Sequence, residues 1–136
     1  MGMDVCGRKP SGEAGKYFRA NIWSWRPIHG LVAELCGDLL DEKTLVGMGY
    51  NQGAGPRSAK VCRQMADRFD EWLEHNADGA AIDDASIRVD ANGRFVSDEE
   101  LAANPSLETR SPYAVEDEHL KEWVAFLREC GGFEVW

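Results

Sequence analysis

Residues 56–76 read PRSAKVCRQMADRFDEWLEHN. Apolar side chains recur along this segment at the helical period, and acidic side chains lie largely outside their stripe; the stripe comprises Val61, Met65, Phe69, Trp72 and Leu73. This pattern is typical of a helix with one buried face. Pro56 or Ser58 can open the helix, because both residue types favour a helix N-terminus. The sequence therefore predicts an amphipathic helix that ends at about Asn76.

Two further segments, one on each side of this helix, show the same period. The first begins at Ser24 and ends near Leu40 or Asp41, with apolar residues Ile28, Leu31, Val32, Leu35 and Leu39. The second runs from about Val115 to Cys130, with apolar residues Leu120, Trp123, Val124 and Leu127. Each set lies on one helical face. We therefore expect three principal amphipathic helices.

Glycine and proline punctuate the segments outside these helices. Residues 44–56 are too rich in glycine for a helix interior, where each glycine costs about 1 kcal/mol relative to alanine, so we expect a short strand or turn and then a loop. Residues 1–23 contain Gly7, Pro10, Gly12 and Gly15, which predict an extended or irregular arm.

Short β elements complete the expected fold. Residues 87–96 favour a β-hairpin, because Asn92 and Gly93 supply the positive φ angles of a tight turn. Ser97 can cap a short helix, and residues 133–136 can add a terminal strand. The predicted fold class is mainly α with a small β component (α+β), in a single domain over residues 1–136.

The composition indicates a packed globule. A chain of 136 residues with 43% hydrophobic residues can bury a substantial core as one domain. The N-terminus lacks the apolar stretch of a signal peptide, and no apolar run is long enough to span a membrane. We therefore expect a cytoplasmic protein without membrane contact. Its four cysteines lie far apart in the sequence, which favours reduced, structural thiols.

The charge is unevenly distributed. A net charge of −9 argues against direct DNA or RNA binding, which needs a basic surface. However, residues 1–26 contain five basic and two acidic side chains, a net charge of +3. This asymmetry points to the N-terminal segment as the place to look for an anionic partner.

The densest group of candidate binding residues lies in that segment and comprises Tyr17, Arg19, Asn21, Trp23, Trp25 and Arg26. Aromatic faces can stack on a heterocycle, guanidinium groups can hold phosphate, and an asparagine amide can read a base or ribose edge. A different interpretation is that the alternating residues form one face of a strand, with the aromatic rings buried. The sequence leaves both open.

A second candidate is the glycine-rich loop before the middle helix, with Asn51, Gln52, Gly53, Gly55 and Arg57. Glycines allow close approach of the backbone to a ligand, and cations in the first turn of a helix oppose its dipole unless an anion is present. The loop is neither a Walker motif nor a dinucleotide-binding fingerprint, so an ordinary connecting loop is the alternative.

Catalytic and metal-binding patterns are weak. His29, His75 and His119 lie on separate predicted helices without metal-ligand spacing. The acidic runs at 83–84, 98–100 and 116–118 lack the spacing of a calcium loop and suit solvated helix caps. We therefore predict no catalytic residue, no metal site and no cofactor.

Two blocks of sequence carry a resemblance to other proteins. The opening reads Asp4-Val-x-Gly-x-x-Pro10 and Gly15-x-Tyr-Phe-Arg-x-Asn-x-Trp-x-Trp-Arg-Pro27, and the ending has Val115-Glu-Asp and Phe126-Leu-Arg-x-Cys-Gly-Gly-Phe-Glu-Val-Trp136. Both resemble an uncharacterised family of small bacterial and phage proteins. Many of its members carry a cysteine-rich, zinc-knuckle-like insert, whereas residues 63–129 contain no cysteine here. The resemblance implies a compact domain and a phage setting, but no reaction.

Three functional hypotheses follow. The first is a non-enzymatic protein that holds a small anionic ligand, such as a nucleotide signal, between the N-terminal arm and the glycine-rich loop. In a phage, it would sequester a host defence signal. The second is an acidic inhibitor or adaptor that occupies a basic, nucleic-acid-binding site on a partner protein. The third is a small-molecule hydrolase, for which the sequence offers no persuasive acid, base or nucleophile.

Overall fold

The computed structural model describes residues 2–76, 79–81 and 87–136, so the acidic pair Asp83 and Asp84 lies outside the described residues. Within these ranges, five α-helices and small antiparallel sheets confirm the predicted α+β class. The helices are α1 (Ile22–Cys36), α2 (Glu42–Gly47), α3 (Ala59–His75), α4 (Asp98–Ala103) and α5 (Asp117–Glu129), with a 3-10 turn, η1, at Glu13–Gly15. The strands are β1 (Gly2–Gly7), β2 (Tyr17–Asn21), β3 (Ala80–Ala81), β4 (Arg88–Val89), β5 (Phe95–Val96), β6 (Ala114–Val115) and β7 (Phe133–Val135).

The N-terminal segment is a β-hairpin, so it is extended as one alternative predicted, and the expectation of an irregular arm was wrong. Strands β1 and β2 pair antiparallel, and β7 joins the other edge of β1 in the order β2-β1-β7. Buried Met3 and Val5 alternate with more exposed neighbours in β1, as Phe18 and Ala20 do in β2. The glycines that suggested irregular structure lie mainly in the connection between the two strands.

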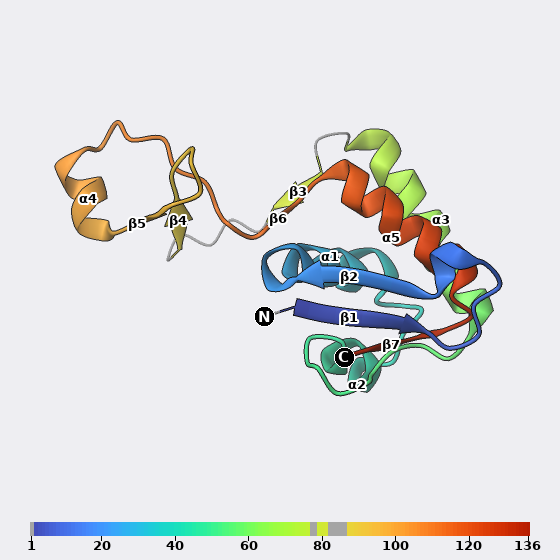
Figure 1. Cartoon of the computed structure of the whole chain (residues 1–136). Coiled ribbons are helices and arrows are strands. Elements are labelled where there is room, and N and C mark those ends of the chain that lie inside the picture. Colours follow the sequence, from blue (N-terminus) through green and yellow to red (C-terminus); the bar gives the residue numbers. More distant parts are fainter. Residues whose placement is uncertain (1, 77–78, 82–86) are drawn as a thin grey trace.

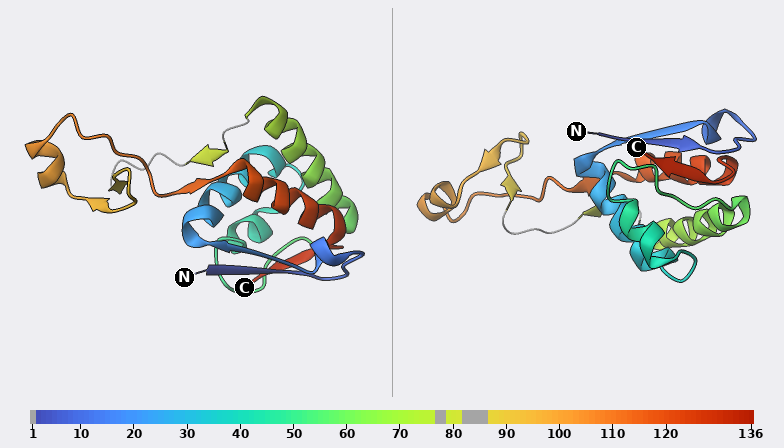
Figure 2. Two further views of the ribbon diagram at one scale, coloured as in Figure 1. Left: turned by 45° about the horizontal axis from the view of Figure 1, so that its top comes forward. Right: turned by 90° about the horizontal axis from the view of Figure 1, so that it is seen from below.

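The long helices α1, α3 and α5 lie on one face of this sheet (Figure 1, Figure 2). Trp123 of α5 is fully buried and contacts Trp25 of α1, Phe69 of α3 and Phe133 of β7 at ring-centroid distances of 5.6, 6.3 and 5.5 Å. One aromatic cluster therefore holds the helices and the sheet together. The opposite face of the sheet is open to solvent, where Tyr17 is exposed.

Helix α1 begins and ends earlier than the sequence predicts. Asn21, not Ser24, is its N-cap: the Asn21 side chain accepts a hydrogen bond of 2.9 Å from the Ser24 N–H. The reason is that β2 continues directly into the helix at Asn21. The helix ends at Cys36, because the chain then turns toward a separate helix.

Helix α2 occupies the start of the segment expected to be a strand or turn, so that prediction was wrong. The Asp41 carboxylate caps it by accepting a hydrogen bond of 2.6 Å from the Thr44 N–H. Gly47 is the last residue of the helix, and the other glycines follow it. Their helix-breaking effect therefore acts on the loop and leaves a helix of six residues intact.

The other predicted boundaries agree with the structure. The Ser58 hydroxyl caps α3 and the Ser97 hydroxyl caps α4. Strands β4 and β5 form the predicted hairpin and Gly93 has a φ of 81°, but Asn92 has no positive φ, so that part of the turn prediction was wrong. The terminal strand is β7.

A segment of the chain projects away from the sheet and long helices (Figure 1, Figure 2). It contains β4, β5 and α4, and the paired strands β3 and β6 lie at its base. The ring of Trp23 from α1 contacts those of Phe95 and Tyr113. Across the described residues, no helix has the length and apolar character needed to span a membrane.

Candidate functional site

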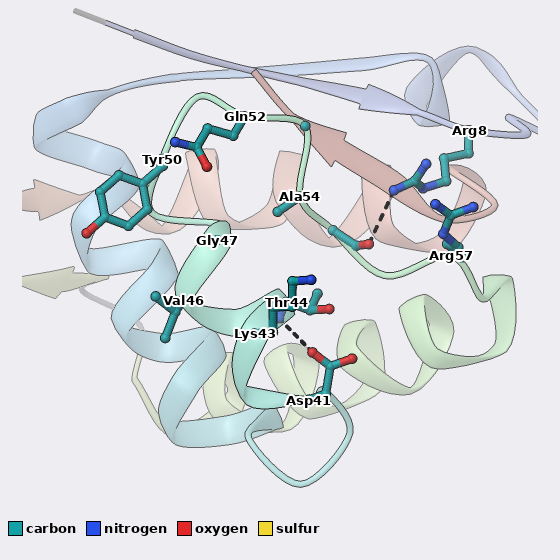
Figure 3. Close-up of a pocket in the computed structure, with 12 residues that line it drawn as sticks. Arg8, Asp41, Lys43, Thr44, Val46, Gly47, Tyr50, Gln52, Ala54 and Arg57 are labelled. Atoms are coloured by element: carbon teal, nitrogen blue, oxygen red, sulfur yellow. Dashed lines mark hydrogen bonds between the residues drawn. The ribbon is translucent and has the colours of Figure 1, made fainter.

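A cavity of about 590 Å³ lies beside α2 and the loop that follows it (Figure 3). We call it the α2 cavity. Helix α2 and residues 50–57 contribute most of its walls, and Arg8 enters from the end of β1. Its lining residues are Arg8, Asp41, Lys43, Thr44, Val46, Gly47, Tyr50, Gln52, Gly53, Ala54, Gly55 and Arg57. A cavity of this volume can hold a small-molecule ligand.

The loop wall is fixed by backbone hydrogen bonds to the C-terminal strand. The Gly53 N–H donates to the Val135 carbonyl at 2.7 Å. In return, the Val135 N–H donates to the Ala54 carbonyl at 2.8 Å, and the Phe133 N–H donates to the Pro56 carbonyl at 2.9 Å. Residues 53–56 therefore run beside β7 as an added edge of the sheet. This pairing gives the cavity one rigid wall.

Two glycines of this wall are required by packing. A Cβ atom at Gly55 would lie 2.2 Å from the Phe133 carbonyl oxygen, so a side chain cannot be accommodated. Gly53 has a φ of 82°, and a Cβ there would lie 2.5 Å from the Trp136 ring. Close approach to a ligand is therefore not needed to explain these glycines, although both line the cavity.

The charge of the cavity is the property that sets it apart from the rest of the protein. Among its described lining residues, Arg8, Lys43 and Arg57 are cationic and Asp41 is the one carboxylate. Lys43 and Arg57 are exposed and make no hydrogen bond or ion pair with another described side chain. The chain as a whole carries −9, so this lining concentrates positive charge on an acidic protein.

Arg8 is held in place by three groups. Its Nε donates to the Phe133 carbonyl at 3.1 Å, one Nη donates to the Glu134 carboxylate at 2.7 Å, and the other donates to the Gly55 carbonyl at 3.3 Å. The side chain is 19% exposed. Arg8 therefore joins β7 to the loop and also presents a fixed positive charge to the cavity.

Asp41 is occupied as a helix cap. The hydrogen bond from the Thr44 backbone N–H is the largest cause that lowers the pKa of Asp41 below its ordinary value. Lys43 lowers this pKa further by charge attraction. A carboxylate with a lowered pKa binds protons weakly, so Asp41 is a poor general base.

The structure brings four of the five predicted loop residues to the α2 cavity, namely Gln52, Gly53, Gly55 and Arg57. Asn51 does not line it; its side-chain amide donates to the Gly2 carbonyl at 3.2 Å and ties the loop to β1.

Three of the predicted arm residues lie away from the cavity. The Tyr17 hydroxyl donates to the Asp4 carboxylate, and this bond is the main cause of a raised Tyr17 pKa. A nitrogen of Arg19 lies 4.0 Å from the same carboxylate. Both side chains belong to the outer face of the sheet, and Asn21 is the cap of α1. Local contacts therefore satisfy these polar groups.

The remaining arm residues lie on α1. Trp25 is 1% exposed, and its indole N–H donates to the Met48 carbonyl at 2.9 Å. Trp23 is half-buried beside Tyr113, and the Arg26 guanidinium carbon lies 4.8 Å from the centre of the Tyr113 ring. Tyr17, Arg19 and Asn21 do share one face of β2, but the strand ends at Asn21, so the alternative that this face continues through Trp23 and Trp25 was wrong.

Sequence reasoning missed Arg8, Lys43 and Tyr50 as cavity residues. Arg8 belonged to the basic N-terminal segment, so the charge asymmetry contained a signal for it. Lys43 could be placed only after α2 was known to be a helix. No group of three His, Cys, Asp or Glu residues suited to a metal ion occurs in the part of the chain that the structure describes. Comparisons with family models, curated proteins and solved structures found no match to this chain.

Proposed function

We propose that the protein binds a small anionic ligand in the α2 cavity and does not transform it. The observation that carries this proposal is the excess of Arg8, Lys43 and Arg57 over Asp41 among the described lining residues. Arg8 is paired with Glu134, whereas Lys43 and Arg57 have no ion-pair partner among the described side chains, so a bound anion would neutralise charges that the fold leaves unpaired. Arginine side chains are well suited to a phosphate group, because their planar donors can hold two of its oxygens.

Binding is favoured over catalysis by the state of the cavity carboxylate. Hydrolysis of a phosphorylated ligand needs a group that activates water. Asp41 has a lowered pKa and already accepts the Thr44 hydrogen bond, so it suits helix capping better than proton abstraction. A binding role uses the same side chains without this requirement.

The resemblance to phage proteins suggests a purpose for such binding. A phage protein that holds a phosphorylated host signal would lower its free concentration and so weaken a defence that depends on it. Expression in bacteria with such a defence should raise phage plating, and the Arg57→Ala variant should not. Equal plating with both proteins would count against this role and leave ligand binding itself unaffected.

Calorimetry with inorganic tripolyphosphate at low salt tests the binding proposal directly. We expect saturable binding that weakens by about tenfold or more in Arg57→Ala, because a hydrogen bond to a charged group contributes about 1.5–3 kcal/mol. Arg63→Ala is the matched control: Arg63 is exposed on α3, outside the described lining of the cavity. No saturable binding, or equal weakening in both variants, would refute the proposal.

The projecting segment favours a second candidate function, in which the protein blocks a basic partner protein. Helix α4 begins with Asp98, Glu99 and Glu100, all exposed, and Phe95 beside it is 58% exposed. This function predicts a salt-sensitive complex that is lost in the Asp98→Asn, Glu99→Gln, Glu100→Gln variant. A complex that survives both high salt and this triple substitution would exclude the acidic helix as its basis.

A further inference from the structure

A second hollow of about 570 Å³ adjoins the α2 cavity on the side of α1. We call it the α1 hollow. Its lining residues are Ile22, Trp25, Arg26, His29, Val46, Gly49, Tyr50 and Tyr113. Val46 and Tyr50 line both spaces, so the two hollows meet at these side chains. Figure 3 shows the Tyr50 ring directed away from Arg8 and toward α1.

The wall of the α1 hollow is aromatic and well supported. Tyr50 is 57% exposed, so its ring is accessible to a ligand. The Trp25 and His29 rings lie nearly parallel, at an interplanar angle of 7°, and the Trp25 indole is anchored to the Met48 carbonyl. Trp25 is buried and supports the His29 ring from within the core, so a planar ligand group entering here would stack on the exposed Tyr50 ring.

The polar groups of the hollow offer both a donor and an acceptor. His29 Nε2 lies 2.6 Å from the Leu45 carbonyl oxygen, which can only accept, so this nitrogen carries the proton. In the neutral ring, Nδ1 is then an acceptor, and no described group donates to it. The Arg26 guanidinium rests on the Tyr113 ring and has no ion-pair partner among the described side chains, so its N–H groups can donate.

We propose that the ligand is a nucleotide whose base occupies the α1 hollow while its phosphates occupy the α2 cavity. This inference rests on the proposed function, because the phosphates are the anion that Arg8, Lys43 and Arg57 attract. The base stacks on Tyr50. On the polar edge of the base, an acceptor receives a hydrogen bond from Arg26, and a donor gives one to His29 Nδ1.

The test compares nucleoside triphosphates with tripolyphosphate, which has the same phosphate chain but no base. Calorimetry on the full chain should show at least one of ATP, GTP, CTP and UTP binding about tenfold or more tightly than tripolyphosphate, since stacking adds to the phosphate contacts. Tyr50→Ala should remove most of this advantage and leave tripolyphosphate affinity unchanged. Tyr50→Phe should retain it, because the ring remains.

Tyr17→Ala is the matched control, since Tyr17 is a similarly exposed tyrosine outside both sets of lining residues. It should leave every affinity unchanged, and thermal melting should show that all three variants fold. If all nucleotides bind no better than tripolyphosphate, or if Tyr50→Ala weakens both ligand types equally, the nucleotide inference fails while anion binding stands. If neither tripolyphosphate nor any nucleotide binds, both proposals fail.

Discussion

The outer face of the sheet and the α2 cavity both display arginine, yet their charges are in different states. On the outer face, Asp4 accepts the Tyr17 hydrogen bond and lies 4.0 Å from Arg19. In the cavity, Arg57 and Lys43 make no such pair with described residues. The comparison teaches that a local excess of basic residues does not locate a binding site. What matters is whether the folded chain neutralises each charge.

The largest expected effect comes from removing the unpaired cations together. The Lys43→Ala, Arg57→Ala double variant should bind tripolyphosphate about 100-fold more weakly, because two contacts to a charged ligand are lost. Arg19→Ala removes a cation from the outer face and should change the affinity less than about twofold, since a distant exposed charge is screened. Calorimetry at one salt concentration measures both. A large loss in Arg19→Ala would break the distinction between the two regions.

Arg8 should affect both stability and binding, because it is the cavity cation with internal partners. Arg8→Ala should lower the free energy of unfolding by about 2 kcal/mol, since the Phe133, Glu134 and Gly55 groups lose their donor. It should also weaken anion binding by about tenfold.

Arg19→Ala provides the stability control in urea denaturation. Its ion pair with Asp4 is long and exposed, so the free energy of unfolding should change by less than about 0.5 kcal/mol. Equal destabilisation by the two substitutions would show that the outer-face pair is as important to the fold as the Arg8 contacts.

The smallest expected effect comes from neutralising the cavity carboxylate. Asp41→Asn preserves a good N-cap residue and removes a negative charge, so tripolyphosphate should bind about two- to threefold more tightly. Asp38→Asn, on an exposed residue paired with Arg68 outside the cavity lining, is the control and should leave the affinity unchanged. Weaker binding in Asp41→Asn would mean that the ligand needs this carboxylate.

The pH dependence of Asp41 follows from its lowered pKa. A carboxyl group whose folded pKa lies below the unfolded value stabilises the fold above the unfolded pKa, about 4, and loses this contribution as the pH falls through the folded value. The amide of Asp41→Asn does not titrate. The difference in urea midpoint between wild type and variant should therefore change below about pH 4 and stay constant above it.

Sequence reasoning succeeded where the controlling interactions are local. The apolar residues of α3 recur every three or four positions. The hydroxyls of Ser58 and Ser97 each accept a hydrogen bond from the backbone N–H only three residues further along the chain. The positive φ of Gly93 in the β4–β5 turn is likewise specified by the residue itself, whereas Asn92 does not adopt the predicted positive φ. These features need no knowledge of distant contacts.

Sequence reasoning failed where short local signals pointed to different structures. The alternation in β1 extends over only a few residues, and the neighbouring glycines masked it. The sequence predicts that the first helix ends near Leu40 or Asp41, whereas Asp41 caps the next helix. For the site, Gln52 and Arg57 line the α2 cavity, whereas for Trp25 the sequence leaves a binding surface and the core open, and the structure places it in the core. An indole suits both roles equally well, so only its neighbours decide between them.

By itself, the sequence determined the α+β class, the long helices and most of their boundaries, because helical period and capping act over a few residues. Only the tertiary structure decided which cations share a cavity. Arg8 meets its partners 47 to 126 residues further along the chain, and that meeting requires β1, β7 and the loop after α2 to lie side by side. Contacts over such separations depend on the assembled fold, since no local pattern encodes them.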